Sequence, residues 1–441
     1  MVMPGRRAVS DSGFALRPML LERDTEREGG RAEIVAPRPA RLRDAQPTRQ
    51  PSSASSRPMT RRQLVLVGAG HAHLDLLAAL SRKALPRGSV TMVTPDADFH
   101  YSGLLPGILA GDVAPSTATI PVTRIATAAG VTVHHTAATG LDLTARVVHL
   151  ANGDVVPFDV LSLDVGSEPS ALDVPGAASH AFPMRPFEAA MKLAARLQSV
   201  IADARRGAIP SVVVGAGAAG VEIAFAIAAR IRRHGHTPRV TLVDPAMTDG
   251  LPLPGFMASS RRLAARALAE RGIALCSARV LEVQADGVHV DDAASGRCVL
   301  PSVATAWVTG PAAPPWFVGS GLACDTQGYA LADARLALDA SATIFGGGDC
   351  VTLREHPHTP KAGVFAVRMA PVLAANVLAV ARGRSPMRHY TPQRSFLALL
   401  STGDGAALLR WRGVAFESRA AQWLKTRIDQ SYLKRYDGLA R

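Results

Sequence analysis

Residues 211–222 carry glycines at the complete GxGxxG spacing. Gly215, Gly217 and Gly220 follow a run of valines and precede an apolar helical pattern. Such a turn lets the backbone approach a pyrophosphate, and it directs the free N–H groups of a helix N-terminus at the anion. Asp244 closes the next apolar run, near the spacing expected for an acid that binds a ribose hydroxyl. The segment predicts a dinucleotide site, and the carboxylate favours NADH over NADPH because it repels a 2′-phosphate.

A second glycine-rich turn lies earlier in the chain, at Gly68 and Gly70, between a short apolar run and a Leu/Ala helical pattern. Gly68 permits a tight strand-to-helix turn, and Gly70 lets the backbone come close to a pyrophosphate. His73 replaces the third glycine, and the next run ends without the usual ribose-binding acid, so that Thr94 or Asp96 must take its place. The turn departs in these two respects from the dinucleotide pattern that it otherwise matches.

A third element combines glycines with an acid late in the chain. Gly348 and Asp349 follow an apolar run, and Lys361, Ala362 and Gly363 open an apolar helical pattern. This segment looks like the second flavin motif of flavoproteins with two dinucleotide domains. The order of the three elements is the order expected of an FAD fold that is interrupted by an NADH domain.

Short runs of Val and Leu, bounded by Gly or Asp, must position these turns. Because the runs do not alternate with polar residues and are separated by helical patterns, they predict buried parallel strands. The runs are 64–67, 90–94, 160–163, 212–214, 240–243 and 343–345. The predicted fold class is α/β, with two Rossmann-like dinucleotide-binding domains and a small C-terminal region.

Residues 62–385 resemble the pyridine nucleotide-disulfide oxidoreductase superfamily. Within it, the chain is most similar to the type II NADH dehydrogenase-like flavoproteins of the branch found fused to selenide, water dikinase. The resemblance is carried by the segments 68–73, 101–107, 159–167, 346–349 and 360–366. His73 in place of a third glycine is typical of that branch.

The resemblance implies a division of the chain into domains. FAD would bind to residues 59–175 together with 311–385, and NAD(P)H to residues 176–310. Residues 386–441 would form the C-terminal region. The segments 159–167 and 304–310 look like the two crossings between the domains, and the same residues also fit ordinary hydrophobic strands that end in glycine.

The resemblance also assigns roles to residues around the flavin. His71 and His73 would lie near the pyrophosphate, and Asp349 would accept a hydrogen bond from a ribitol hydroxyl. The loop after the second strand would wrap the isoalloxazine through Ser102, Gly103 and Pro106. The helix start at Ala362 and Gly363 would face the pyrimidine edge of the flavin.

The implied reaction is hydride transfer from NADH to flavin N5 and onward to an acceptor. Glu222 would contact the nicotinamide ribose or amide, although an acid in a first helical turn also complements the helix dipole. Lys361 would stabilise the negative charge of the reduced flavin, and a solvated surface lysine is the alternative. In this interpretation the cofactors supply the chemistry, and the protein supplies orientation and electrostatics.

The four cysteines narrow the chemistry further. Cys276, Cys298, Cys324 and Cys350 include no close pair, which argues against a disulfide scaffold, a metal site and a CxxC redox centre. Disulfide reductases of the superfamily need a cysteine pair against the flavin, and that pair is missing here. Thiol or sulfide chemistry through cysteines is therefore not expected, and the cysteine usage favours a reducing, cytoplasmic compartment.

The formal charge of +13 is concentrated at the two ends of the chain. Residues 1–58 carry +4 and residues 382–441 carry +8, which leaves the body nearly neutral. A nucleic-acid enzyme would carry its basic residues on the folded body, so this class is excluded. The Arg-, Pro- and Ser-rich extension 1–58 is predicted to be disordered.

Residues 418–436 predict an amphipathic basic helix. Ala421, Leu424, Ile428 and Tyr432 form one stripe, and Lys425 is among the basic residues that flank it. Such a helix could lie on an anionic membrane at the inner face of the cell membrane, or it could pack onto the protein. Membrane contact fits a quinone acceptor. The alternatives are a soluble reductase for a protein or selenium-metabolism partner, and a redox sensor that does not turn over.

Overall fold

The computed structural model describes residues 62–86, 89–204, 207–292 and 295–439, so the extension 1–58 lies outside the described residues. A first sheet of five parallel strands gathers segments from the beginning and the end of the chain. In sheet order its strands are β21 (Ile344–Gly346), β9 (Val160–Leu163), β1 (Leu64–Val67), β2 (Val90–Val93) and β5 (Thr132–His134). All four residues of β1 and of β9 are buried, as expected for a parallel sheet that is covered on both faces.

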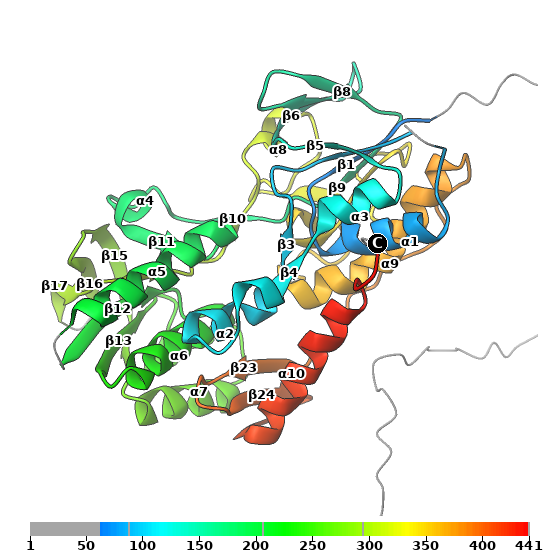
Figure 1. Cartoon of the computed structure of the whole chain (residues 1–441). Helices are drawn as coiled ribbons and strands as arrows, with labels where there is room; N and C mark the ends of the chain where they lie inside the picture. The colour runs from blue at the N-terminus through cyan, green and yellow to red at the C-terminus, as the bar shows by residue number, and fades with distance from the viewer. Residues whose placement is uncertain (1–61, 87–88, 205–206, 293–294, 440–441) are drawn as a thin grey trace, which may run out of the picture. The chain divides into compact units, whose positions relative to one another are not determined.

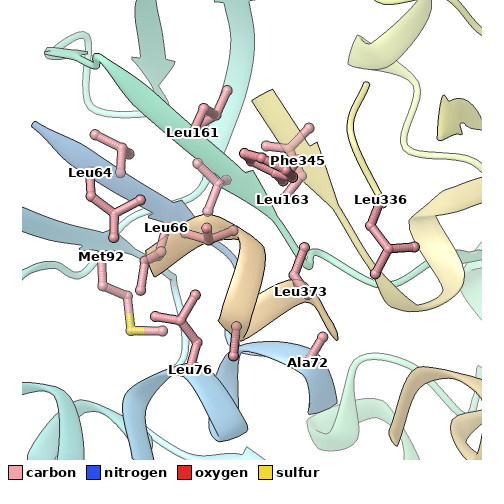
Figure 2. Packing of buried hydrophobic residues seen from close by; sticks show 14 of the residues in the cluster. Leu64, Leu66, Ala72, Leu76, Met92, Leu161, Leu163, Leu336, Phe345 and Leu373 are labelled. Carbon is pink, nitrogen blue, oxygen red and sulfur yellow. The ribbon is translucent and has the colours of Figure 1, made fainter. Parts of the chain in front are cut away.

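Helices α1 (His71–Arg82), α3 (Val122–Ala128) and α9 (Gly363–Ala381) pack on this sheet and on one another. Figure 2 shows Leu66 of β1 and Leu163 of β9 above side chains of α1 and α9, among them Leu76 and Leu373. The apolar face of α1 repeats with helical spacing, which is why the same residues form a helix and cover the strands. One core therefore unites residues more than 300 positions apart and fixes where the strands end.

A second parallel sheet is formed by the middle of the chain. In sheet order its strands are β11 (Ala181–Pro183), β18 (Thr305–Trp307), β12 (Ala208–Val214), β13 (Thr237–Val243) and β14 (Ala274–Cys276). Its helices are α5 (Phe187–Asp203), α6 (Ala218–Arg233) and α7 (Ala258–Glu270). The predicted α/β class with two Rossmann-type sheets is confirmed, and each predicted strand lies within a few residues of an observed one.

Smaller antiparallel sheets complete the two parallel ones. Their strands are β6 (Ala138–Asp142), β7 (Val147–Leu150) and β8 (Val155–Pro157); β15 (Ala278–Val283), β16 (Gly287–Asp292) and β17 (Gly296–Pro301); and β23 (Ala398–Ser401), β24 (Ala407–Trp411) and β25 (Val414–Ser418). Three short pairs are β3 (Phe99–His100) with β4 (Thr119–Ile120), β10 (Glu168–Pro169) with β19 (Pro311–Ala312), and β20 (Ala330–Ala332) with β22 (Val351–Leu353). Two one-turn helices are α4 (Ala177–His180) and α8 (Trp316–Gly319). The β10–β19 pair joins the two crossing segments that connect the sheets.

The short helix α2 (Leu105–Ala110) belongs to the second core, although it precedes that sheet in sequence. Leu105 and Leu109 are buried in the cluster that α5 and α6 form, and α2 packs against both helices. The loop that follows β2 is thus held at one end by the first sheet and at the other by the helices of the second. A contiguous division of the chain at residue 175 does not capture this packing.

The C-terminal helix α10 (Arg419–Lys434) runs from the β23–β25 sheet toward α1 (Figure 1). Ser418 caps it by accepting a hydrogen bond from the Ala421 amide at 3.0 Å. Its buried residues are Ala421, Lys425, Asp429 and Tyr432. Two residues of the predicted stripe, Ala421 and Tyr432, therefore pack onto the protein, whereas Leu424 and Ile428 are only half-buried. The position of Lys425 corrects the expectation of a basic flank: it lies on the buried face, where two carboxylates and a backbone carbonyl surround it.

Helix α9 is long and apolar enough to cross a membrane by length and composition alone. Its most apolar window is 56% buried within the fold, against α1 and the first sheet. A core helix passes the same test, so this property is weak evidence for a span.

Candidate functional site

Three strands of the first sheet end at one edge: β1 and β21 continue into the predicted flavin motifs, and β9 continues into Asp164. Gly68 follows β1 with φ +89°, and a Cβ there would lie 2.4 Å from the Asp164 carbonyl oxygen, which follows β9. Gly348 follows β21 with φ +73°. Both positions need glycine, because the backbone is left-handed and the neighbouring chain is close. The first and third motifs, 280 residues apart, thus meet at one site.

The carboxyl group of Asp164 lies at the centre of this edge. The sequence indicated this residue only as part of a crossing segment. Asp164 is 2% exposed, and its Oδ2 accepts a hydrogen bond from the His73 amide at 2.8 Å. A Cβ at Gly70 would meet its Oδ1 at 2.5 Å, and one at Gly348 would meet the same oxygen at 2.7 Å. Burial, helped by the charge of nearby Asp349, raises the pKa of Asp164 to about 7, although hydrogen bonds from the His73 and Ala72 amides act to lower it.

The ring of His73 contacts groups of the protein on both of its nitrogens. It is fully buried, with Nδ1 2.7 Å from the Gly68 carbonyl oxygen and Nε2 2.8 Å from the Ser162 hydroxyl. Burial lowers its pKa to about 4, so the ring is neutral near pH 7. A third glycine would give close packing between helix and strand, and here the imidazole pins the turn to β9 instead. His73 faces the predicted pyrophosphate region through its backbone amide.

His71 begins α1 and lies among aromatic rings. Its ring centroid is 4.8 Å from that of Phe99, and Tyr432 of α10 lies 5.7 Å away. A Cβ at Gly363, the first residue of α9, would lie 3.5 Å from His71 Nε2. Burial lowers the pKa of His71 to about 4, only partly offset by Asp349. The starts of α1 and α9 therefore meet around a neutral imidazole, with Ala362 as the N-cap residue of α9.

The predicted isoalloxazine loop is fixed by its neighbours. Ser102 and Gly103 form a 3-10 turn, and a Cβ at Gly103 would lie 2.7 Å from the Tyr101 ring. Pro106 is buried in the first turn of α2. Thr94, expected near the adenosine ribose, is 1% exposed at the end of β2. Thr94 therefore lies at the carboxyl edge of the first sheet. Ser102, Gly103 and Pro106 lie on the loop that continues from this edge.

Asp349 has a partner that the sequence did not reveal. Arg185, which follows β11 of the second sheet, places Nη2 3.1 Å from Asp349 Oδ2 and donates to the Ser167 hydroxyl at 2.6 Å. Asp349 is 7% exposed, whereas the Arg185 side chain is 48% exposed. The guanidinium thus joins a crossing segment to the third motif. No spacing in the sequence relates two residues 164 positions apart, so only the fold could show the pair.

Lys361 lies beside the third motif, at a small cavity lined also by Gly348, Asp349 and Phe365. Its ammonium group donates to the Val351 carbonyl and to the Thr352 hydroxyl, and it lies 4.0 Å from the centroid of the Tyr329 ring. Burial lowers the pKa of Lys361, against neighbouring acids that raise it. The side chain is therefore held in place at the predicted flavin edge, and it is not a freely solvated surface lysine.

The second motif lies at the carboxyl edge of the second sheet. Gly215 follows β12 with φ +107°, and a Cβ at Gly220 would lie 1.7 Å from the Gly215 carbonyl oxygen, so the third glycine lets α6 pack on the turn. At Gly217, the N-cap residue of α6, a Cβ would meet nothing within 4 Å. Asp244 follows β13 and accepts from the Ala216 amide at 2.7 Å. The acid thus lies beside the glycine turn, as a ribose-binding residue must.

Glu222, on α6, belongs to a buried charged cluster with Lys425 and Asp429 of α10. Its Oε1 accepts from the Ser401 amide at 2.8 Å and lies 3.9 Å from Lys425 Nζ. Lys425 donates to the Gly103 carbonyl at 2.8 Å and to Asp429 at 3.1 Å. The Tyr101 hydroxyl donates to Asp429 at 3.0 Å. Helix α10 therefore connects the helix of the second glycine turn to the loop of the first sheet.

The buried cluster contains two carboxyl groups, of Glu222 and Asp429, and one ammonium group, of Lys425. Burial raises the pKa values of Glu222 and Asp429, and Lys425 only partly offsets it. For Lys425, burial lowers the pKa, but the two carboxylates outweigh it and the net shift is upward. One ammonium serves two carboxylates, so the cluster has a place for one further proton.

All four cysteines are free, and Cys350 is buried next to the site. Its sulfur donates to the Gly347 carbonyl at 3.1 Å, and burial raises its pKa to about 12. It is therefore a protonated packing residue and not a thiolate nucleophile. Among the described residues no three His, Cys, Asp or Glu side chains gather as a metal site.

Two parallel sheets, each ending in a glycine turn and a helix N-terminus, define the class of oxidoreductases that bind a flavin and a pyridine nucleotide on separate Rossmann-type folds. The glycines at positions 70 and 348, the helix amides and Asp349 suit the phosphates and hydroxyls of a flavin dinucleotide. The family profile of pyridine nucleotide-disulphide oxidoreductases matches residues 62–370. The chain belongs to this family.

The relatives of this chain agree with that assignment. An NADH dehydrogenase-like protein of Mycobacterium tuberculosis is 29% identical over 67% of this chain and 74% of its own length. A demethylphylloquinone reductase of Synechocystis is 25% identical over 74% of this chain and 78% of its own. The structure of NDH2 from Plasmodium falciparum in complex with NADH superposes with a TM-score of 0.72 at 12% identity, over 85% of this chain and 97% of that one. The chain is therefore a flavin-dependent NAD(P)H oxidoreductase, and it resembles the type II NADH dehydrogenase-like proteins.

Proposed function

We propose that the protein is an FAD-dependent NADH dehydrogenase that passes electrons to a quinone. The observation that carries the proposal is the meeting of the Gly68–Gly70 turn with Gly348 and Asp349 at one sheet edge, while a complete glycine turn with its own acid lies on a second sheet. FAD would be held by residues 59–175 and 311–385, and NADH by residues 176–310. Bound FAD would supply the two-electron acceptor for the hydride of NADH.

The residues of the second turn would orient NADH. Gly215, Gly217 and Gly220 would bring the backbone to the pyrophosphate, and Asp244 would accept from the 2′-hydroxyl of the adenosine ribose. Glu222, buried and held by the Ser401 amide, would contact the nicotinamide end. Its fixed position would reduce the entropy cost of orienting the dihydronicotinamide.

The residues of the first sheet would hold FAD. Amides at the start of α1 would bind the pyrophosphate, and Asp349 would leave Arg185 to accept from a ribitol hydroxyl. Lys361 would place its positive charge at the pyrimidine edge, where it would stabilise the anionic reduced ring. Ser102, Gly103 and Pro106 would form the wall that holds the isoalloxazine.

A quinone acceptor is favoured by the demethylphylloquinone reductase relative and by two exposed tryptophans of the C-terminal region. Trp423 of α10 is 57% exposed with the Arg427 guanidinium 5.6 Å from its ring, and Trp411 of β24 has Arg412 at 5.2 Å. Aromatic rings with arginines at a surface suit the interface of an anionic membrane. We therefore place the protein at the inner face of the cell membrane, with residues 418–441 as the contact.

An anaerobic titration of the purified protein tests this proposal. A yellow protein whose flavin absorbance is bleached by NADH, and more slowly by NADPH, is expected, and a short-chain quinone should restore the colour. Sedimentation with anionic liposomes, with and without residues 418–441, tests the membrane contact. A colourless protein, or a flavin that NADH does not reduce, would refute the dehydrogenase, whereas reoxidation by oxygen alone would refute only the quinone.

A further inference from the structure

The carboxyl of Asp164 occupies the position at which an anion would be expected. In a dinucleotide site the amides in the first turn of α1 would donate to a pyrophosphate. Here the amides of Ala72 and His73 donate to Asp164. The carboxyl also fills the space that two glycines leave, since Cβ atoms at Gly70 and Gly348 would lie 2.5 and 2.7 Å from its Oδ1. A diphosphate bound here must therefore lie against this side chain.

An ionised Asp164 and a diphosphate would repel each other strongly in so buried a place. A neutral carboxyl removes the repulsion: one oxygen keeps its bond from the His73 amide, and the protonated oxygen can donate to a phosphate oxygen. We propose that Asp164 is a residue of the pyrophosphate site and binds FAD in its protonated form, so that FAD binding takes up a proton wherever the free carboxyl is ionised. The inference rests on the proposed FAD site.

Among the titratable groups around Asp164, we expect only Asp164 itself to change its protonation state between pH 6 and pH 8.5. His71 and His73 on α1 have pKa values lowered to about 4 by burial, and the Cys350 thiol beside β21 has a pKa raised to about 12. Asp349 forms an ion pair with Arg185. Burial raises the pKa of Asp164 itself to about 7, within this interval.

The proton uptake gives FAD affinity a defined pH dependence. By linkage, with the free carboxyl titrating near 7 and the bound one kept neutral by the phosphates, the Kd for FAD rises about tenfold per pH unit above 7 and about 30-fold from pH 6 to pH 8.5. At pH 7.5 binding takes up about three quarters of a proton. Asp164→Asn keeps an acceptor for the His73 amide and a donor for phosphate, so its Kd is expected to be independent of pH.

The experiment is a fluorescence titration of the apoprotein with FAD across this pH range, with calorimetry in two buffers of different ionisation enthalpy to count protons. Asp159→Asn is the matched control, because Asp159 lies exposed before the other end of β9 and accepts from the Gln63 amide at 2.7 Å. The control should keep both the slope and the proton uptake. If apoprotein cannot be reconstituted, the rate of FAD release from the holoprotein provides the same comparison.

Two outcomes would overturn the inference. One is a Kd of the native chain that does not change with pH and takes up no proton, as expected if Asp164 moved aside while ionised. The other is a slope that persists in Asp164→Asn. Absence of FAD binding at every pH would instead refute the proposed function, so the two failures are distinguishable.

Discussion

At the first turn Gly70 caps α1 with φ −72° and ψ −175°, and at the second Gly217 caps α6 with φ −68° and ψ −178°. The two turns thus share their backbone and differ in what fills them. A Cβ at Gly70 would strike the Asp164 carboxylate, whereas a Cβ at Gly217 would meet nothing within 4 Å. The glycine pattern specifies the backbone of an anion site, and residues distant in sequence decide whether the site is open or already holds a carboxyl group.

The largest expected effect is a loss of stability on substitution of Gly220, compared with the same substitution at Gly217 in the same turn. In Gly220→Ala the new Cβ would lie 1.7 Å from the Gly215 carbonyl oxygen, a backbone atom, so α6 must move away from the turn. We expect a loss of more than about 5 kcal/mol of unfolding free energy, or no soluble protein. Gly217→Ala is the matched control, since its Cβ enters open space.

Thermal unfolding and NADH binding distinguish these two variants. Gly217→Ala should keep the stability of the native chain and bind NADH more weakly, because its methyl group stands where the backbone would approach the pyrophosphate. Equal stability losses in both variants would show that the second turn is not open at Gly217.

The first turn should show its difference in the pH dependence of stability. The pKa of Asp164 rises from an ordinary 3.8 to about 7 on folding, so its contribution is present below pH 4 and is lost as the pH rises to about 7. Three pH units correspond to at most about 4 kcal/mol. The apoprotein variant Asp164→Asn should therefore be as stable as the native chain at low pH and more stable at pH 8.

The neighbouring histidines act in the opposite direction. His71 and His73 have pKa values lowered to about 4, so they stabilise the fold as the pH rises from about 4 to 6.5. The stability of the native chain alone can therefore look flat with pH. The difference between variant and native chain, measured by chemical denaturation at each pH, isolates Asp164, and a constant difference would contradict its titration.

Restoring the third glycine tests what holds the first turn. His73→Gly matches the dinucleotide pattern better but loses the two ring contacts with Gly68 and Ser162 and leaves a cavity. We expect a loss of about 3 kcal/mol in unfolding free energy. Unchanged stability in denaturant unfolding would mean that the imidazole does not pin the turn to β9.

The sequence predicted features that depend on neighbours along the chain. The valine and leucine runs located β1, β9 and β13, and the glycines located both turns, because burial and positive φ impose local residue choices. It missed Asp164 as a site residue and Arg185 as the partner of Asp349, and it assigned Lys425 to the basic flank of the amphipathic helix. Each of these depends on residues from 91 to 322 positions away, which only the packing of the two sheets and α10 brings together.

The smallest expected effect concerns the acid of the second turn. Asp244 accepts from the Ala216 amide at 2.7 Å and from the Ala246 amide at 2.8 Å, so it both braces the turn and places a negative charge beside it. Asp244→Asn keeps an acceptor for Ala216 and removes the charge that would repel a 2′-phosphate. The preference for NADH over NADPH, measured as the ratio of kcat/KM values, should fall about tenfold, equivalent to about 1.4 kcal/mol. An unchanged ratio would mean that Asp244 only stabilises the loop. The carboxylate of the second turn, like that of Asp164 at the first, would then bind backbone amides of the turn and would not select the ligand.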